Sequence, residues 1–167
     1  MSAPQPEILG VDIGGVVIDR VNDHTDTSFF GSNYLKTTAV NLALPSLAQL
    51  VNRRFFGNVF LVSKCGVQTE AKTREWLDHH QFYLRTGIRR ENVCFCRERR
   101  DKAPLCKELG ITHFIDDRLE VLGFLDSVPN CFLFQPQDRE VQKFKHFLPK
   151  VHRVESWTEV LDRLLEK

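Results

Sequence analysis

The sequence predicts an α/β fold, in which helices cover both faces of a mostly parallel, five-stranded sheet. Short apolar runs rich in Val, Ile and Phe recur along the chain, and amphipathic stretches separate them. This alternation is typical of parallel sheets, because the connection between two parallel strands usually carries a helix. With 167 residues, 42% of them hydrophobic, the chain is long enough for one full core and too short for two ordinary domains. We therefore expect a single domain over residues 1–167.

Five apolar runs are predicted to form the strands. They are short, as buried strands of a parallel sheet are. The runs are Ile8 to Asp12, with a continuation through Val16, Val17 and Ile18, then Val59 to Ser63, Val93 to Cys96, His113 to Asp116, and Cys131 to Phe134.

Helices are predicted between the strands from apolar periodicity and from capping residues. One helix is expected to start after Asp101, to carry Pro104 in its first turn and to stop at Gly110. The other helices are expected over residues 44–54, through Trp76 to His80 after a Thr69 cap, over Arg118 to Leu125, and after Ser156, which forms a capping box with Glu159.

Charge and composition argue against several classes of partner. The 23 Lys and Arg residues nearly balance the 22 Asp and Glu residues, so no global field attracts nucleic acid or an anionic membrane. A basic cluster over residues 85–102 is interrupted by Glu91, Glu98 and Asp101 and lacks a series of aromatic residues, which favours a solvated face over nucleic-acid binding. No apolar run is long enough for a membrane span, and the odd number of five cysteines argues against a secreted disulfide framework. We expect a cytoplasmic protein.

Polar residues follow several of the predicted strands where the strands end. Asp12, Ser63, Asp116 and Asp117 lie at such ends, and Lys102 opens the helix after the third strand. In an open parallel sheet these ends share one edge, where ligands bind. Carboxylates at this edge can hold Mg²⁺, and Asp12 can attack phosphorus. Ser63 and Lys102 would then bind the phosphoryl oxygens.

The order of these residues resembles the haloacid dehalogenase superfamily of phosphohydrolases. The resemblance covers roughly residues 8–134 and implies a Rossmann-like, three-layer sandwich with the first strand at its centre. By position it makes Asp12 the nucleophile and a Mg²⁺ ligand, Gly14 a ligand through its carbonyl, and Asp117 a ligand with Asp116 beside it. The stretches that carry it are Asp12-Ile13-Gly14-Gly15-Val16, Leu61-Val62-Ser63, Lys102 at a helix start, and Phe114-Ile115-Asp116-Asp117.

The sequence departs from the phosphatases of this superfamily at Gly14. These enzymes usually carry an aspartate there, which protonates the leaving oxygen and later activates water, and a glycine can do neither. Three explanations stay open: the reaction needs no general acid there, the protein binds a phosphorylated ligand without efficient turnover, or an acid from a flap over residues 19–38 substitutes. The candidate acids of the flap are Asp19, Asp23, Asp26 and His24.

The chain leaves no room for a large inserted cap domain, because only about 25 residues separate Ile18 from the next predicted helix. The resemblance then implies an open site that takes macromolecular substrates, or that a second copy or a protein partner covers. The expected ligand is a phosphorylated small molecule or a phosphoprotein. Two other hypotheses are a non-catalytic regulatory module that keeps the metal and phosphate site, and a purely structural α/β protein.

Overall fold

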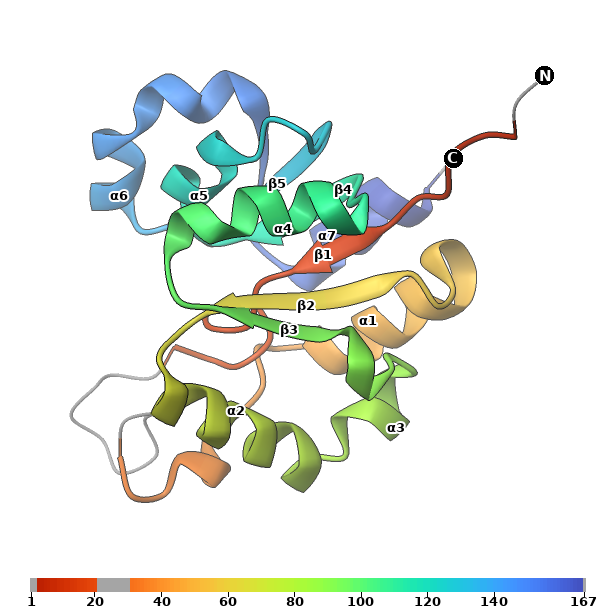
Figure 1. Ribbon diagram of the computed structural model, residues 1–167, viewed down its shortest axis with the longest axis vertical. Coiled ribbons are helices and arrows are strands. Elements are labelled where there is room, and N and C mark those ends of the chain that lie inside the picture. The colour runs from red at the N-terminus through yellow and green to blue at the C-terminus, as the bar shows by residue number, and fades with distance from the viewer. Residues whose placement is uncertain (1–2, 21–30, 167) are drawn as a thin grey trace.

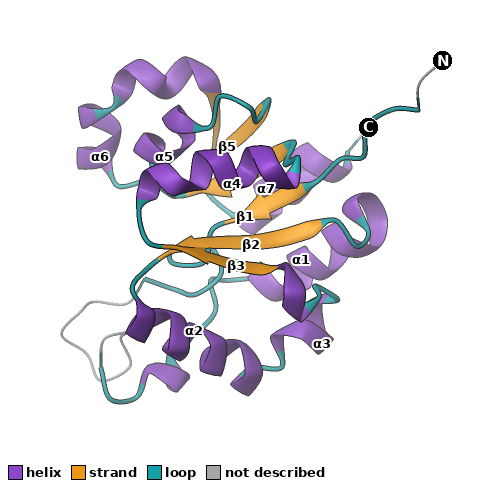
Figure 2. Cartoon of the chain, in the orientation of Figure 1, coloured by secondary structure: helices purple, strands orange, loops and turns teal. Residues whose placement is uncertain are grey.

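A computed structural model of the chain describes residues 3–20 and 31–166. It confirms the α/β class and the parallel sheet, but the sheet has six strands, all parallel, in the order β3-β2-β1-β4-β5-β6 (Figures 1 and 2). This is the strand order of a Rossmann-like sheet. The strands are β1 (Leu9–Val11), β2 (Val59–Lys64), β3 (Val93–Cys96), β4 (His113–Asp116), β5 (Asn130–Phe134) and β6 (Val151–Val154).

The predicted number of five strands was wrong because β6 carries no apolar run. Its sequence is Val-His-Arg-Val, its two central residues are exposed, and only Val154 is buried. The strand lies at the edge of the sheet and pairs with β5 alone, with Val154 in register with Phe134. An edge strand needs less burial than a central one, so the hydrophobic pattern missed it.

The predicted continuation of the first strand through Ile18 was also wrong. The backbone N–H groups of Val17 and Ile18 both donate to the carbonyl of Ile13, at 2.9 and 3.0 Å, so the chain turns back there. The turn buries Val16, Val17 and Ile18, which explains why an apolar pattern continues beyond the strand. The side of the sheet where β1 ends is therefore bordered by a tight turn.

The described residues form seven α-helices. Figure 1 shows that helices cover both faces of the sheet. One face packs against α1 (Ala43–Leu50), α2 (Val67–His79), α3 (Phe82–Thr86) and α7 (Trp157–Leu165). The other face packs against α4 (Lys102–Leu109), α5 (Leu119–Phe124) and α6 (Asp138–Lys143). Two separate clusters of buried apolar side chains, one on each side of the sheet, form the core of a three-layer sandwich.

Most capping predictions agree with the structure. Gly110 ends α4 with a φ of 70°, and the Ser156 hydroxyl at the start of α7 accepts from the Glu159 N–H at 3.1 Å. The Thr69 cap was wrong, because α2 already begins at Val67, with Gly66 as the preceding residue. The helix predicted over residues 44–54 is α1 followed by a π-helical turn, η2 (Val51–Phe55).

The segment that returns from the predicted flap is fixed to the core. Trp76 Nε1 donates to the Thr37 carbonyl at 2.8 Å, and the Val40 N–H donates to the Val17 carbonyl at 2.8 Å. Residues 21–30 of the predicted flap, with Asp23, His24 and Asp26, lie outside the described residues. Within residues 31–42, the only helix is the single turn η1 (Tyr34–Lys36), so this part of the insertion holds no cap domain.

The sheet brings the predicted site residues to one edge. The chain order reverses at β1, because β2 and β3 lie on one side of it and β4 to β6 on the other. In sheets of this kind a crevice opens at the carboxyl ends of the strands where the order reverses. Val11 is in register with Leu61 of β2 and with Ile115 of β4, so the polar residues that follow these positions meet.

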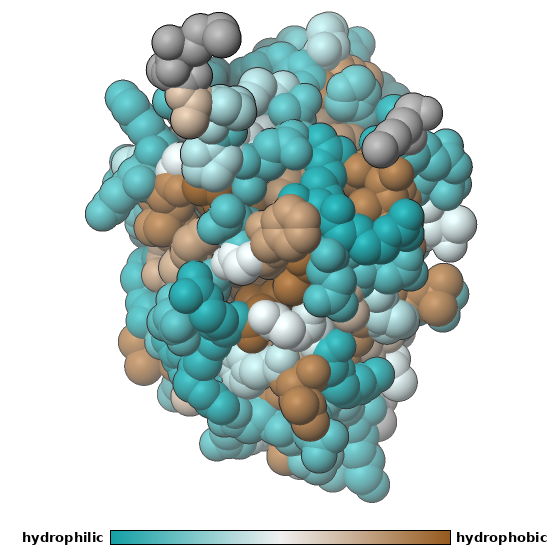
Figure 3. Space-filling model, turned by 90° about the vertical axis from the view of Figure 1, so that its right-hand side faces the viewer, coloured by the Kyte–Doolittle hydropathy of each residue, from teal (hydrophilic) through white to brown (hydrophobic). Residues whose placement is uncertain are grey.

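The opposite end of the molecule is mostly hydrophilic. Figure 3 views the side where the strands begin, and hydrophobic residues are exposed there only between larger hydrophilic areas. Among the described residues, no helix combines the length and the apolar character that a membrane span requires.

We expect that packing against β4 requires a glycine at position 10 of β1. A Cβ atom at this position would lie 2.6 Å from the Phe114 ring of β4, so Gly10→Ala is expected to lower the free energy of unfolding by about 1–3 kcal/mol. Urea denaturation measures the loss. The matched control is Gly57→Ala, because a Cβ atom there would meet nothing within 4 Å. Equal losses in the two variants would contradict the packing argument.

Candidate metal centre

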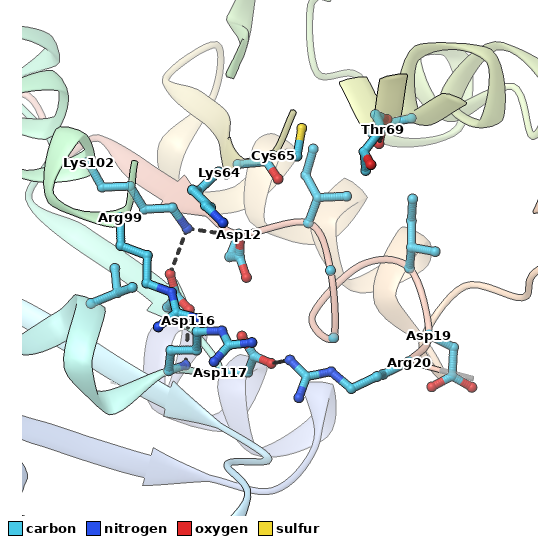
Figure 4. A pocket seen from close by; sticks show the side chains of 18 of the residues that line it. Asp12, Asp19, Arg20, Lys64, Cys65, Thr69, Arg99, Lys102, Asp116 and Asp117 are labelled. Atoms are coloured by element: carbon cyan, nitrogen blue, oxygen red, sulfur yellow. Dashed lines mark hydrogen bonds and ion pairs between the residues drawn. The ribbon is translucent and has the colours of Figure 1, made fainter. Parts of the chain in front are cut away.

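A cavity of about 460 Å³ opens at the carboxyl ends of the central strands (Figure 4). Its size is typical of ligand-binding pockets. The cavity is lined by all six residues that the sequence predicted for the site. These residues are Asp12 after β1, Gly14 in the following turn, Ser63 near the end of β2, Lys102 at the start of α4, Asp116 at the end of β4, and Asp117 directly after it.

Lys102 is the central cation of the site. Its Nζ donates to Asp12 Oδ1 at 3.0 Å and to Asp116 Oδ2 at 2.9 Å, and its side chain is only 3% exposed. The capping box between Glu98 and Asp101 starts the helical segment one turn earlier and so sets the direction of the first turn of α4. Burial disfavours the ammonium ion, but the Asp116 and Asp12 carboxylates outweigh it and raise the pKa of Lys102 above its usual range. Lys102 is therefore charged.

Asp116 is fixed through both of its carboxylate oxygens. Oδ2 accepts from Lys102, and Oδ1 accepts from the backbone N–H of Arg118 at 3.0 Å, just before α5. The second contact is the one expected of a residue that caps a helix. Asp116 thus has a structural role in addition to its place in the cluster.

Asp117 pairs with a different cation than Asp12 and Asp116 do. Its Oδ2 accepts from the Arg20 guanidinium, while its Oδ1 is buried without a hydrogen-bond partner among the described residues. Burial, and then the neighbouring Asp12 and Asp116 carboxylates, raise the pKa of Asp117 to about 9. A buried oxygen without a partner is costly unless another group binds it.

Asp12 has a raised pKa for the same reasons. Burial makes the largest contribution and the Asp116 carboxylate the next, and Lys102 only partly opposes them. The cluster therefore concentrates more negative charge than Lys102 neutralises.

The three carboxylates fit a divalent cation. Asp12, Asp116 and Asp117 each offer an oxygen atom, and these atoms lie within 4.8 Å of one another. Mg²⁺ prefers oxygen ligands, and its charge would lower the raised pKa values of Asp12 and Asp117. The unpartnered Oδ1 of Asp117 supports this fit, because a bound cation would satisfy it.

The two glycines after Asp12 differ in what they permit. Gly15 has a φ of 80°, and a Cβ atom there would lie 2.6 Å from Asp117 Oδ2, so the turn needs a glycine. A Cβ atom at Gly14 would meet nothing within 4 Å, and Gly14 has no positive φ. Packing therefore does not require glycine at the position where a general acid was expected.

Asp19 is the only one of the four candidate flap acids that belongs to the described residues. It lines the edge of the cavity, and in Figure 4 its carboxylate points away from Asp12. In this conformation Asp19 is not directed at a phosphoryl group bound to Asp12.

The sequence analysis did not indicate Arg20 as a residue of the cavity. Lys64 lines the same cavity but is exposed, whereas Lys102 is buried between two carboxylates. Arg20 directly follows Asp19 in the predicted flap, and no motif marks it. Only its position shortly after the first strand could have indicated a place near the strand ends.

The basic cluster over residues 85–102 is divided by ion pairs. Arginines of this segment pair with acids from other elements at 2.7 to 2.9 Å, namely Arg90 with Asp78, Arg97 with Glu70, and Arg99 with Glu120.

Comparison of the sequence with protein-family models and with curated protein sequences finds no match to either. The geometry of the site therefore carries the functional argument.

The raised pKa of Asp117 predicts a pH-dependent stability in metal-free protein. Between the unfolded pKa near 3.9 and the native pKa of about 9, the native state holds a proton that the unfolded state has lost. Stability from this group therefore falls as the pH rises. Asp117→Asn should reduce the loss between pH 5 and pH 8 by about 1–4 kcal/mol, measured by urea denaturation with a chelator.

The control for this experiment is Asp162→Asn, which removes an exposed carboxylate of α7. If Asp117→Asn and wild type lose the same stability over this pH range, Asp117 is not the protonated group.

Proposed function

We propose that the chain is a magnesium-dependent phosphohydrolase of the haloacid dehalogenase type, which acts through an aspartyl-phosphate at Asp12. The observation that carries this proposal is the buried cluster of Asp12, Asp116 and Asp117 around Lys102, at the place where the strand order reverses. Such a cluster combines a nucleophile, a phosphate-binding cation and oxygen ligands for a metal at one cavity.

In the proposed reaction, an Asp12 carboxylate oxygen forms a bond to phosphorus while the bond from phosphorus to the leaving oxygen breaks. Lys102 holds Asp12 Oδ1 and so fixes the carboxylate in one orientation. Ser63 and Lys102 bind the oxygens of the transferring phosphoryl group. A divalent cation held by Asp12, Asp116, Asp117 and the Gly14 carbonyl would neutralise negative charge on the carboxylates and on the phosphoryl group. Water then hydrolyses the acyl phosphate and regenerates the Asp12 carboxylate.

The other cations of the cavity favour a phosphorylated ligand. Lys64, Arg99 and Arg118 line the cavity in addition to Lys102 and Arg20. Cationic walls attract anions and raise their local concentration. We propose a phosphorylated small molecule or a phosphoprotein as substrate, with a second copy of the chain or a protein partner covering the open site. All five cysteines are free thiols, as in a reducing cytoplasm, which is the compartment we propose.

A second candidate function follows from Gly14. Without a carboxylate at this position, the site can bind a metal and a phosphate group but lacks a general acid for a poor leaving group. Among the described residues, Asp19 does not replace it. A binding module that keeps the metal and phosphate site would show magnesium-dependent phosphate affinity without turnover.

Asp12→Asn tests the nucleophile. The amide has nearly the same shape but cannot form the acyl phosphate, so kcat/KM for p-nitrophenyl phosphate with Mg²⁺ is expected to fall by about 10³-fold or more. Asp162→Asn serves as the control, since it removes an exposed carboxylate outside the cavity. Mass spectrometry after acid quench should find a phosphoryl group on the Asp12 peptide of wild type. Unchanged activity in Asp12→Asn would exclude the proposed intermediate.

Gly14→Asp tests whether only the general acid is missing. The position has space for a side chain, so the variant is expected to fold. A carboxylate there should raise kcat about 10²-fold for an alkyl phosphate, and less for p-nitrophenyl phosphate, whose leaving group needs little protonation. Steady-state kinetics on both substrates measures the difference. An equal or absent gain would count against this explanation of Gly14.

A further inference from the structure

Arg20 provides a second cation to the acidic cluster, from a different element than Lys102. Its Nη2 donates to Asp117 Oδ2, and Figure 4 shows the side chain reaching across the cavity to this carboxylate. The backbone before it is fixed, because the Asp19 N–H donates to the Thr38 carbonyl at 2.9 Å. Arg20 therefore neutralises the carboxylate that Lys102 does not contact.

Gly15 creates the space for this ion pair. A Cβ atom at Gly15 would lie 2.6 Å from Asp117 Oδ2 and 3.2 Å from Arg20 Nη2. The guanidinium and the carboxylate thus meet directly against the backbone of the turn after Asp12.

The two cations of the cluster differ in exposure. Lys102 is 3% exposed and bonded to two carboxylates, whereas the Arg20 side chain is 40% exposed and, within residues 3–20 and 31–166, forms an ion pair with Asp117. A long side chain at the edge of a cavity can move its charged end into solvent while its stem stays against the protein. Lys102 is therefore held by more contacts and is less accessible to solvent than Arg20.

We propose that Arg20 is a built-in electrostatic competitor, which a divalent cation bound at Asp117 Oδ1 repels from Oδ2. Both cations would bind the same carboxyl group, Arg20 at Oδ2 and the metal at Oδ1, so their positive charges would lie close together and repel each other. Arg20 thereby lowers the affinity of the site for metal. The inference shares with the proposed function only the metal-binding cluster, and it does not require turnover.

Metal affinity in Arg20 variants tests the competition. Arg20→Gln keeps a long polar side chain without the charge, so Mn²⁺ should bind roughly three- to tenfold more tightly than to wild type, while Arg20→Lys should stay near wild type. Electron paramagnetic resonance of free Mn²⁺ measures the dissociation constants at fixed pH and salt. Arg118→Gln removes a charge from the same cavity without an ion pair to the cluster, and a smaller change is expected there.

A second measurement detects the displacement of Arg20 itself. Phenylglyoxal modifies accessible arginines, and mass spectrometry locates the modified residue. Saturating Mn²⁺ should increase the rate of modification at Arg20 several-fold in wild type and leave Arg53, an exposed arginine of η2, unchanged. Asp117→Asn should abolish this effect of the metal.

Two results would overturn the inference. In the first, wild type binds Mn²⁺ and Asp117→Asn abolishes this binding, but Arg20→Gln binds Mn²⁺ no more tightly than wild type. This result would show that Arg20 does not compete with the metal, and it would leave the proposed function intact. Absence of Mn²⁺ binding in both wild type and Arg20→Gln would reject the metal cluster, and with it the metal-dependent part of the proposed function.

Discussion

The site depends on one buried ammonium ion. Lys102 lies between Asp12 and Asp116, at 3.0 and 2.9 Å. Asp12 directly follows β1, where the order of the sheet reverses, and Asp116 ends the neighbouring strand β4. A buried charge is tolerated only when it is paired. Here the ammonium group compensates the two carboxylates, and the carboxylates compensate the ammonium group. The interaction therefore joins the ends of β1 and β4 to the start of α4. Every other group of the cavity is placed relative to this fixed arrangement.

The fold was largely predictable from the sequence where burial controls the residue pattern. The central strands β1, β2 and β4 are apolar because both of their faces are covered, and their positions were predicted within a few residues. The hydrophobic pattern gave wrong predictions where a strand is not buried on both faces, or where a buried apolar segment is not a strand. The edge strand β6 keeps polar residues because its surroundings are partly solvent, and the buried turn at Val16 to Ile18 is apolar without being a strand.

The site residues were predictable for a related reason. Neighbouring parallel strands end at the same edge of the sheet, so polar residues at the strand ends lie close together in the fold. Asp12, Ser63 and Asp116 were found in this way, and Lys102 through its place at a helix start. Arg20 was not, because its contact with Asp117 depends on the turn at Gly15, and a long side chain leaves no periodic signal.

The contact between Lys102 and Asp12 spans 90 positions of the chain, whereas the contact between Lys102 and Asp116 spans 14. During synthesis, β1 and β2 leave the ribosome well before α4 and β4, and Asp12 then has neither its cation nor its neighbouring carboxylates. In that interval Asp12 is an ordinary hydrated acid at the end of a short apolar segment. The unusual electrostatics of the centre belong to the completed sheet and arise only when its second half has folded against the first.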